Sequence, residues 1–157
     1  MDSMRNVAVD RGAASGTTSH RHRLLGLAAT GVVATLAAMT ATTVAAALAE
    51  AMGVDFEIPH GGQAIPVPGF TVVTGLFSLV GVVIAVAVLR WSARPAERFV
   101  WTAVFLTAIS LVPPLLSGAD TATITALVGL HLVAATVMIP TLARGLRSRT
   151  DRRSSEG

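Results

Sequence analysis

Four long apolar stretches dominate the chain, and each is long enough to cross a lipid bilayer as a helix. They occupy about residues 24–50, 70–90, 99–117 and 121–143. An α-helix rises 1.5 Å per residue, so about 20 residues span the ~30 Å hydrocarbon core of a membrane. The pattern therefore predicts an all-α fold, a bundle of four transmembrane helices.

The low charge content supports this prediction. Only 13% of the 157 residues are charged, about half of the ~25% that is typical of a soluble domain. The four helices and their connections use residues 24–146, which leaves no room for a separate soluble enzyme domain. The polar segments 1–23 and 147–157 have little to bury, so we expect both to be disordered basic tails in the cytoplasm.

The arginines indicate how the helices cross the membrane. All twelve basic residues are arginines, and they lie in residues 1–23, in the 90–98 connection and in residues 144–157. The 50–69 and 117–120 connections contain four carboxylates and no arginine. Because arginine-rich segments stay in the cytoplasm, we expect a multi-pass protein of the plasma membrane with both termini cytoplasmic. The net charge of +3 then reflects membrane insertion, and we expect no nucleic-acid partner.

The first apolar stretch has an alternative interpretation. An arginine-rich start, an apolar run and the sequence Ala47-Leu48-Ala49 before Glu50 resemble a secretory signal with its cleavage site. The apolar region of a signal is only about 7–15 residues long. Residues 24–49 contain no charge and exceed that length, which favours a helix that is retained.

Two stripes of small residues are predicted to be helix contacts. Small side chains let helices approach closely in lipid, where packing replaces the hydrophobic effect as the driving force. The stripes are Ala37, Ala41, Ala45 and Ala49 in the first stretch, and Thr74, Ser78, Gly81 and Ala85 in the second.

His131 lies near the middle of the fourth stretch, roughly 16 Å along the helix from Asp120. Ionisable residues at this depth are costly and mark candidate sites. Thr107 and Ser110 of the third stretch lie at nearby depths. Either His131 is a structural hydrogen-bond partner, or it takes up protons or binds a ligand.

Pro113 and Pro114 complete this candidate intramembrane site. Each lacks an N–H group, so two carbonyls one turn earlier lose their helical partners. Such carbonyls need neighbouring helices, hydroxyls or water. The pair is therefore either a broken helix that lines a polar site, or a kink that ends the helix near the outer surface.

A second candidate cluster is predicted at the outer surface. It comprises Glu50, Asp55, Glu57, His60 and Asp120. Prolines and glycines in residues 50–69 forbid a continuous helix and indicate a compact cap with a short extended piece. The acidic residues could bind a cation, although their spacing is not that of a metal site, and a solvated loop is the alternative. Asp120 is placed to cap the fourth helix through the N–H of Ala122 or Thr123.

The sequence contains few candidate catalytic residues. Cysteine is absent, which excludes disulfides, thiolate catalysis and cysteine-ligated metals in this chain. There is no deeply embedded carboxylate, and no nucleophile stands close to a base. We therefore expect no enzymatic activity, no cofactor and no metal.

Several short segments carry a family resemblance. They are FEIP at 56–59, AIP at 64–66, GF at 69–70, SLVPP at 110–114, DTAT at 120–123, HLVAA at 131–135 and IP at 139–140. They resemble a family of small, uncharacterised four-helix integral membrane proteins found mostly in actinobacteria, classed as a domain of unknown function. The resemblance covers roughly residues 24–146 and implies that the first helix is retained, but it implies no activity.

Three functions remain open at this point. The first is a non-catalytic accessory or partner-binding role in the lipid bilayer, with a homo-oligomer or a membrane-protein partner. The second is an oligomeric transporter or channel subunit with a polar site near His131 and the Pro113-Pro114 break. The third is a membrane enzyme that acts on a lipid or a quinone.

Overall fold

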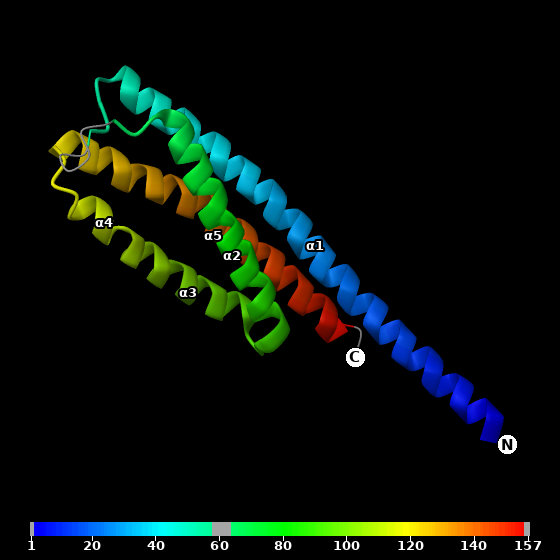
Figure 1. Ribbon diagram of the computed structural model, residues 1–157. Helices are drawn as coiled ribbons and strands as arrows, with labels where there is room; N and C mark the ends of the chain where they lie inside the picture. Colours follow the sequence, from blue (N-terminus) through cyan, green and yellow to red (C-terminus); the bar gives the residue numbers. More distant parts are fainter. Residues whose placement is uncertain (1, 58–63, 156–157) are drawn as a thin grey trace.

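The computed structural model describes the backbone of residues 2–57 and 64–155, and the side chains of residues 21–22, 24–57 and 64–151. The described residues form helices α1 (Asp2–Ala51), α2 (Val67–Trp91), α3 (Pro95–Ser110), α4 (Val112–Leu115) and α5 (Thr121–Ser155). Successive long helices run in opposite directions, so both chain ends lie at the same end of the bundle (Figure 1). The predicted all-α fold is confirmed.

Within the described residues, four segments are long and apolar enough to cross a membrane. They are Leu24–Ala51, Val67–Trp91, Pro95–Leu115 and Thr121–Asp151. Each coincides with one predicted stretch. Prolines at the first turns of α2 and α3 help to set where these helices begin, because proline fits the first helical turn without losing a hydrogen bond.

The two tails differ from the prediction. Residues 2–23 were expected to be disordered, yet α1 already begins at Asp2, and α5 continues through the second tail to Ser155. Extending a helix that is already formed adds a hydrogen bond per residue without a new nucleation cost. The long apolar helices therefore serve as nuclei for polar extensions that would not form helices alone.

Helices α2 and α5 occupy the middle of the bundle. Both α1 and α3 pack against α2 and α5, whereas α1 and α3 do not contact each other in the described part of the chain. The short α4 packs against α5 as well. Figure 1 shows the first helix beside the last one, although they are furthest apart in the sequence.

The contact face of α1 differs from the predicted stripe. Its buried residues include Leu27, Ala34, Ala38, Thr42, Ala46 and Ala49. Of the predicted stripe, Ala37 is exposed, Ala41 and Ala45 are half-buried, and only Ala49 is buried. Small residues surround this helix on all sides, so the sequence does not mark one face. The α2 stripe was predicted better, since Ser78 and Ala85 are buried.

Close approach of α1 and α2 depends on two glycines. A β-carbon at Gly31 would lie only 2.6 Å from Cγ2 of Val82, and one at Gly75 would lie 3.1 Å from Sδ of Met39. Since real β-carbons are not found so close to a branched side chain, Gly31 sets the distance between these two helices.

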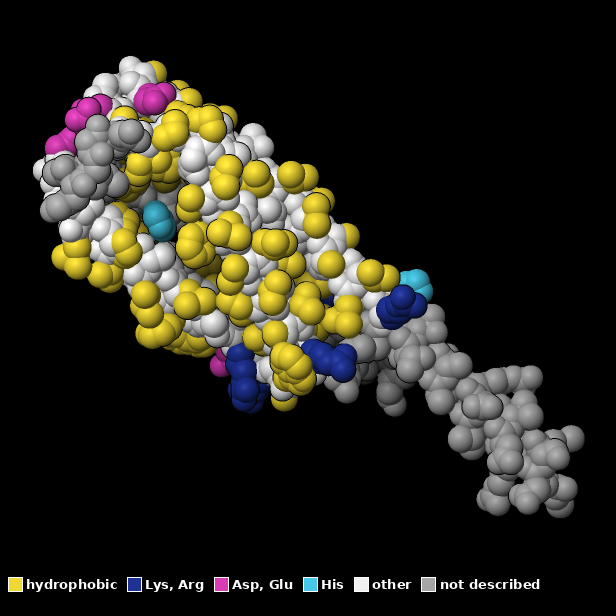
Figure 2. Space-filling view, viewed as in Figure 1, with side chains coloured by type: hydrophobic (Ala, Val, Ile, Leu, Met, Phe, Trp, Pro, Cys, Tyr) yellow, Lys and Arg dark blue, Asp and Glu magenta, His cyan; other side chains and the backbone are white. Residues whose placement is uncertain are grey.

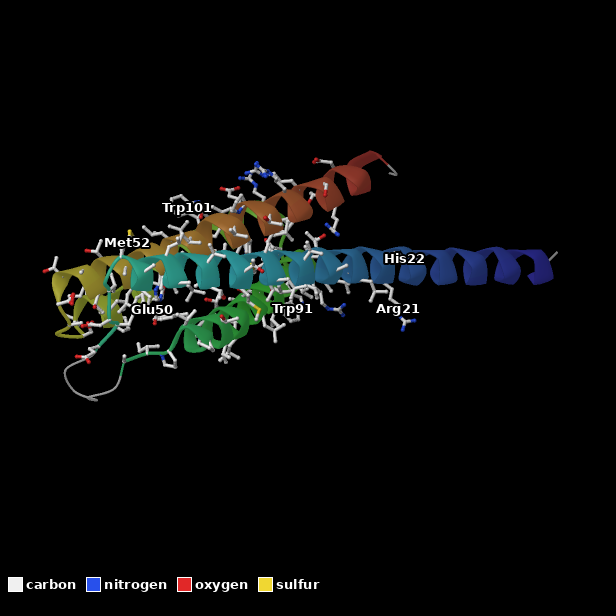
Figure 3. All side chains as sticks on the ribbon, turned by 90° about the horizontal axis from the view of Figure 1, so that it is seen from above. Arg21, His22, Glu50, Met52, Trp91 and Trp101 are labelled. Atoms are coloured by element: carbon white, nitrogen blue, oxygen red, sulfur yellow. The ribbon has the colours of Figure 1, made fainter. Side chains whose placement is uncertain are left out.

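The two ends of the bundle carry different charges. The arginine end is defined by Arg21, Arg90, Arg94, Arg98, Arg144 and Arg147, and the acidic end by Glu50, Asp55, Glu57 and Asp120. Figure 2 shows arginines and most of the carboxylates at opposite ends of a broad apolar surface. Figure 3 likewise shows Glu50 and Met52 at one end of the apolar part of α1, and Arg21 and His22 toward the other.

The core is divided into two clusters along the bundle. The arginine-end cluster comprises Leu27, Ala34, Ala38, Val82, Ala85, Phe99, Met138, Leu142, Ala143 and Leu146. The acidic-end cluster comprises Ala46, Ala49, Phe56, Leu127 and Leu130. Between the members of the two clusters along each helix lie Thr42 on α1, Ser78 on α2 and His131 on α5, and we call this part of the bundle the level between the clusters.

The connection after α1 folds over the acidic end, as the predicted compact cap requires. Phe56 is fully buried, its ring centroid lies 4.8 Å from that of Phe70, and its carbonyl accepts the N–H of Ile65 at 3.3 Å. Glu57 and Ala64 form an isolated β-bridge. Phe56 has a left-handed φ of 53°, which costs about 1–2 kcal/mol and is offset by burial of its ring.

Candidate functional site

His131 of α5 is half-buried, and its ring turns back onto its own helix. Its Nδ1 lies 2.9 Å from the carbonyl oxygen of Leu127, one turn earlier. A carbonyl only accepts, so Nδ1 carries the proton in this bond. The interaction satisfies one ring nitrogen within α5 and needs no partner from another helix.

Thr107 and Ser110 of α3 are also half-buried and bond within their own helix. The Ser110 hydroxyl donates to the carbonyl of Thr107 at 2.8 Å. Among the described residues, no hydrogen bond joins either of them to His131. The structure thus brings Ser110 and Thr107 together, but it does not assemble them with His131 into a hydrogen-bonded cluster.

The backbone stays helical through the Pro113-Pro114 pair, which lies in α4. Leu111 stays in the right-handed helical region, with φ −79° and ψ −17°, and α4 continues the helix for one more turn. The N–H of Leu115 bonds to the carbonyl of Leu111 at 3.3 Å. Pro113 is exposed and Pro114 is buried. The helix ends one residue after the pair, at Leu115 near the acidic end.

The level between the two core clusters contains an unpaired hydroxyl that was not predicted. Thr42 is only 2% exposed, and its Oγ1 has no hydrogen-bond partner among the described residues. Thr35 of the same helix shares this property. By contrast Thr43 donates to the carbonyl of Met39 at 2.7 Å and also bonds the hydroxyl of Thr71 at 2.5 Å.

The acidic residues lie at one end of the bundle but do not converge. Glu50, Asp55 and Glu57 are exposed, and the Asp55 carboxylate accepts the N–H of Glu57 at 3.2 Å. Among the side chains described, those of residues 21–22, 24–57 and 64–151, no three acidic or histidine groups come close enough to hold a metal ion. His60 lies outside the described residues.

Asp120 caps α5, and the prediction of this role is confirmed. Its Oδ1 accepts the N–H of Thr123 at 2.6 Å, and its Oδ2 accepts the Thr123 hydroxyl at 3.2 Å. Thr123 is fully buried. The carboxylate therefore satisfies one of the free N–H groups in the first turn of the helix.

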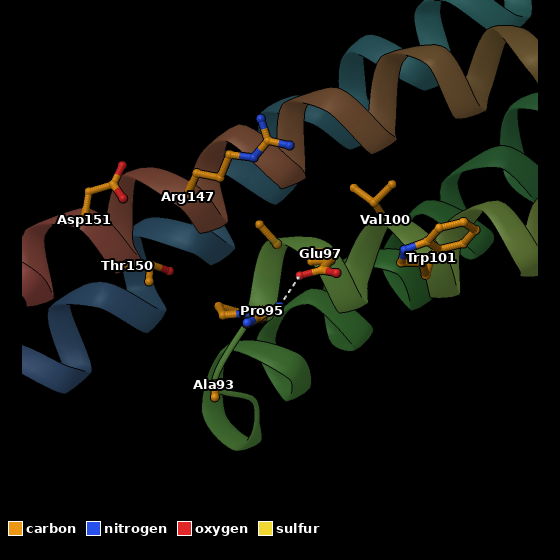
Figure 4. A pocket seen from close by; sticks show the side chains of 10 residues that line it. Ala93, Pro95, Glu97, Val100, Trp101, Arg147, Thr150 and Asp151 are labelled. Atoms are coloured by element: carbon orange, nitrogen blue, oxygen red, sulfur yellow. Dashed lines mark ion pairs between the residues drawn. The ribbon is translucent and has the colours of Figure 1, made fainter.

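The structure has a groove at the arginine end that the sequence did not predict. It lies between the start of α3 and the last turns of α5, with a volume of about 380 Å³. Its lining comprises Ala93, Arg94, Pro95, Ala96, Glu97, Val100, Trp101, Arg147, Thr150 and Asp151. In Figure 4, Arg147, Thr150 and Asp151 lie on α5, across from the turn and helix that carry Pro95, Glu97 and Val100.

Two features of the sequence lie in this groove, but they are not enough to predict it. Trp101 follows an arginine-rich connection by a few residues, and Arg147 follows the fourth apolar stretch. Both features indicate a membrane interface. Only the packing of α3 against α5 brings them together.

The structure thus defines an all-α chain with four long apolar helices and oppositely charged ends. The chain belongs to a family of unknown function (DUF6069), whose model matches residues 22–148. This match agrees with the extent of the predicted family resemblance. No curated protein and no solved structure matches the chain.

Proposed function

We propose that this chain is a multi-pass protein of an actinobacterial plasma membrane, with both termini in the cytoplasm, and that its role there is non-catalytic. It acts as an accessory protein that binds a partner within the bilayer, either another membrane protein or a second copy. The four apolar helices support the location, and the arginine end supports the orientation under the positive-inside rule.

One observation carries the non-catalytic role: polar side chains in the apolar helices bond mainly to their own backbone. Such bonds satisfy the side chain locally. They run from Thr30 to Gly26, Thr40 to Leu36, Thr43 to Met39, Ser110 to Thr107, Thr125 to Thr121, Thr136 to Val133 and Thr141 to Val137, with His131 bonded to Leu127. These groups are occupied by helix carbonyls and do not converge on a common centre.

Reporter fusions test the orientation. Alkaline phosphatase fused after Ala64 is expected to be active, since that connection would face the cell exterior, and the same enzyme fused after Gly157 is expected to be inactive. The reverse pattern would overturn the orientation. Equal activity in both fusions would contradict a helical bundle with four crossings.

Photo-crosslinking in native membranes tests the partner-binding role. A photoreactive residue is placed at Leu36 on α1 or at Phe105 on α3, since both are exposed and lie on helices that do not touch in the part of the chain that the structure describes. We expect one of the two positions to give an adduct of a single defined mass. Twice the mass of the chain identifies a second copy. Uncrosslinked chain alone at both positions would count against the proposal.

The second candidate is an oligomeric transporter or channel subunit, and the buried hydroxyl of Thr42 favours it. An unpaired hydroxyl at the level of His131 is a group that water or a ligand could satisfy. Ion flux into proteoliposomes separates the two functions. We expect no flux above that of protein-free vesicles, whereas flux that His131→Leu and Thr42→Val abolish would establish the transporter.

A further inference from the structure

The groove between α3 and α5 combines an apolar floor with a charged rim. Ala93, Pro95, Ala96 and Val100 supply apolar surface, and Arg94, Glu97, Arg147 and Asp151 supply charge. A second depression of about 500 Å³ adjoins it and adds Arg98 and Thr102. An amphipathic lining of this kind matches a ligand that is itself polar at one end and apolar at the other.

Trp101 places the groove at the edge of the apolar surface. This side chain is 71% exposed and Trp91 is 78% exposed, and tryptophan prefers the boundary between hydrocarbon and headgroups. In Figure 2 the arginine side chains likewise lie where the apolar surface ends. In a bilayer the groove would therefore open at the level of the lipid headgroups.

The charges around the groove favour a single negative charge on the ligand. Three arginines (Arg94, Arg98 and Arg147) stand against two carboxylates (Glu97 and Asp151), which leaves one net positive charge. A headgroup with one phosphodiester and no amine balances that charge. A headgroup that also carries an ammonium group leaves it unbalanced.

The arginines are available to such a ligand. The Arg147 side chain is exposed, and it forms no hydrogen bond or ion pair with the side chains described, those of residues 21–22, 24–57 and 64–151. Arg94 pairs with Glu97 at 3.5 Å, but the two side chains are 79% and 59% exposed. An exposed pair of this kind contributes little, so a phosphate can replace the Glu97 carboxylate as the partner of Arg94.

We propose that this groove binds the headgroup of an anionic phospholipid from the leaflet on the arginine side. Arg94, Arg98 and Arg147 bind the phosphodiester, and Val100 and Trp101 contact the glycerol and the first methylene groups. Basic pockets between transmembrane helices are suited to such headgroups. The inference rests on the proposed membrane location, although it does not depend on which side of the membrane the arginine end faces.

Native mass spectrometry of the detergent-solubilised full chain tests the site with phosphatidylglycerol as the probe. Arg147→Gln is expected to weaken phosphatidylglycerol binding about fivefold, since one arginine near the headgroups contributes about 1 kcal/mol. Asp151→Asn is expected to strengthen it, because it removes a competing negative charge. Arg21→Gln is the matched control, since Arg21 is exposed at the same end but lies on α1, away from Trp101 (Figure 3).

Three results would overturn the site. Equal weakening by Arg147→Gln and Arg21→Gln would mean that only the overall charge matters. Phosphatidylcholine binding as tightly as phosphatidylglycerol would remove the role of net charge. Displacement of the lipid by millimolar inorganic phosphate would mean that the groove binds a free anion.

The reporter fusions keep this inference separate from the proposed function. If the fusions give the expected pattern while phosphatidylglycerol binding is insensitive to Arg147, the lipid site alone is wrong. If the fusions give no sign of membrane crossing, the proposed location is wrong, and the lipid site falls with it.

Discussion

Arg149 of α5 and Thr30 of α1 are 119 residues apart in the sequence, yet Nη2 of Arg149 lies 3.5 Å from the Thr30 hydroxyl. The same guanidinium donates through Nη1 to the carbonyl of Gly145 at 2.6 Å. Gly26 leaves room for it, since a β-carbon there would lie 2.9 Å from Nη2. One side chain thus joins the first and last helices at the arginine end.

Replacing this side chain is expected to loosen the contact between α1 and α5. Arg149→Ala should lower the free energy of unfolding by about 1.5–3 kcal/mol, the range for hydrogen bonds to charged groups. The measurement is denaturant unfolding in lipid-free micelles, followed by circular dichroism. Arg147→Ala is the matched control because that side chain is exposed. Equal losses in the two variants would contradict the role of Arg149.

The left-handed backbone at Phe56 leads to an unusual order of stability. Phe56→Ala loses the buried ring and should cost about 3–5 kcal/mol. Phe56→Gly loses the same ring but relieves the backbone strain of about 1–2 kcal/mol, so the glycine variant should be the more stable of the two. Thermal unfolding of both variants measures this difference. Phe77→Ala is the control, since Phe77 is 66% exposed, and a less stable Phe56→Gly would show that the strain is unimportant.

The close crossing of α1 and α2 predicts a rescue experiment. Gly31→Ala should destabilise the bundle by about 1–3 kcal/mol, because the new methyl group meets the branched side chain of Val82. Adding Val82→Ala should recover part of that loss. A double-mutant cycle measures the coupling between the two positions.

Gly129 supplies the control for this experiment. A β-carbon at Gly129 meets nothing within 4 Å, so Gly129→Ala should be neutral or stabilising, given the higher helix propensity of alanine. If the losses at Gly31 and Val82 simply add, the two residues do not limit the approach of the helices.

The cap of α5 predicts a local effect. Asp120→Ala should cost about 0.5–2 kcal/mol, whereas Asp120→Asn keeps an acceptor for the Thr123 N–H and should cost less. Hydrogen exchange of residues 121–124 locates the effect at the first turn of α5. Glu50→Ala is expected to leave that turn unchanged, and faster exchange in this control would mean that the acidic end responds to charge in general.

The sequence predicted the helices better than their contacts. Long uncharged runs indicated the positions of the four apolar helices. Asp120 was predicted to cap the fourth helix because its carboxylate can accept a backbone N–H of the first turn. The buried face of α1 could not be predicted, because alanine, threonine and valine occur on every side of this helix. The sequence pattern therefore does not distinguish Ala38, which is buried, from Ala37, which is exposed. Periodicity marks a buried face only where the opposite face is polar.

The direction of the His131 side chain could not be predicted. Counting residues placed His131 near the middle of a membrane-spanning helix, yet no count could show that its ring bonds to Leu127 of its own helix. The groove at the arginine end could not be predicted, because it forms only where α3 packs against α5. That packing brings Trp101 and Arg147 into the lining of the same groove. Long-range packing of this kind depends on helix rotation, and a single sequence leaves that rotation undetermined.

Pairing of the first helix with the last also constrains biosynthesis. During translation α1 is made first, and α2 can cover one part of its contact face early. The part that belongs to α5 stays without its partner until almost the whole chain has been made. Any chain that stops before residue 121 would leave that surface open, which gives the cell a physical means to distinguish incomplete chains from finished ones.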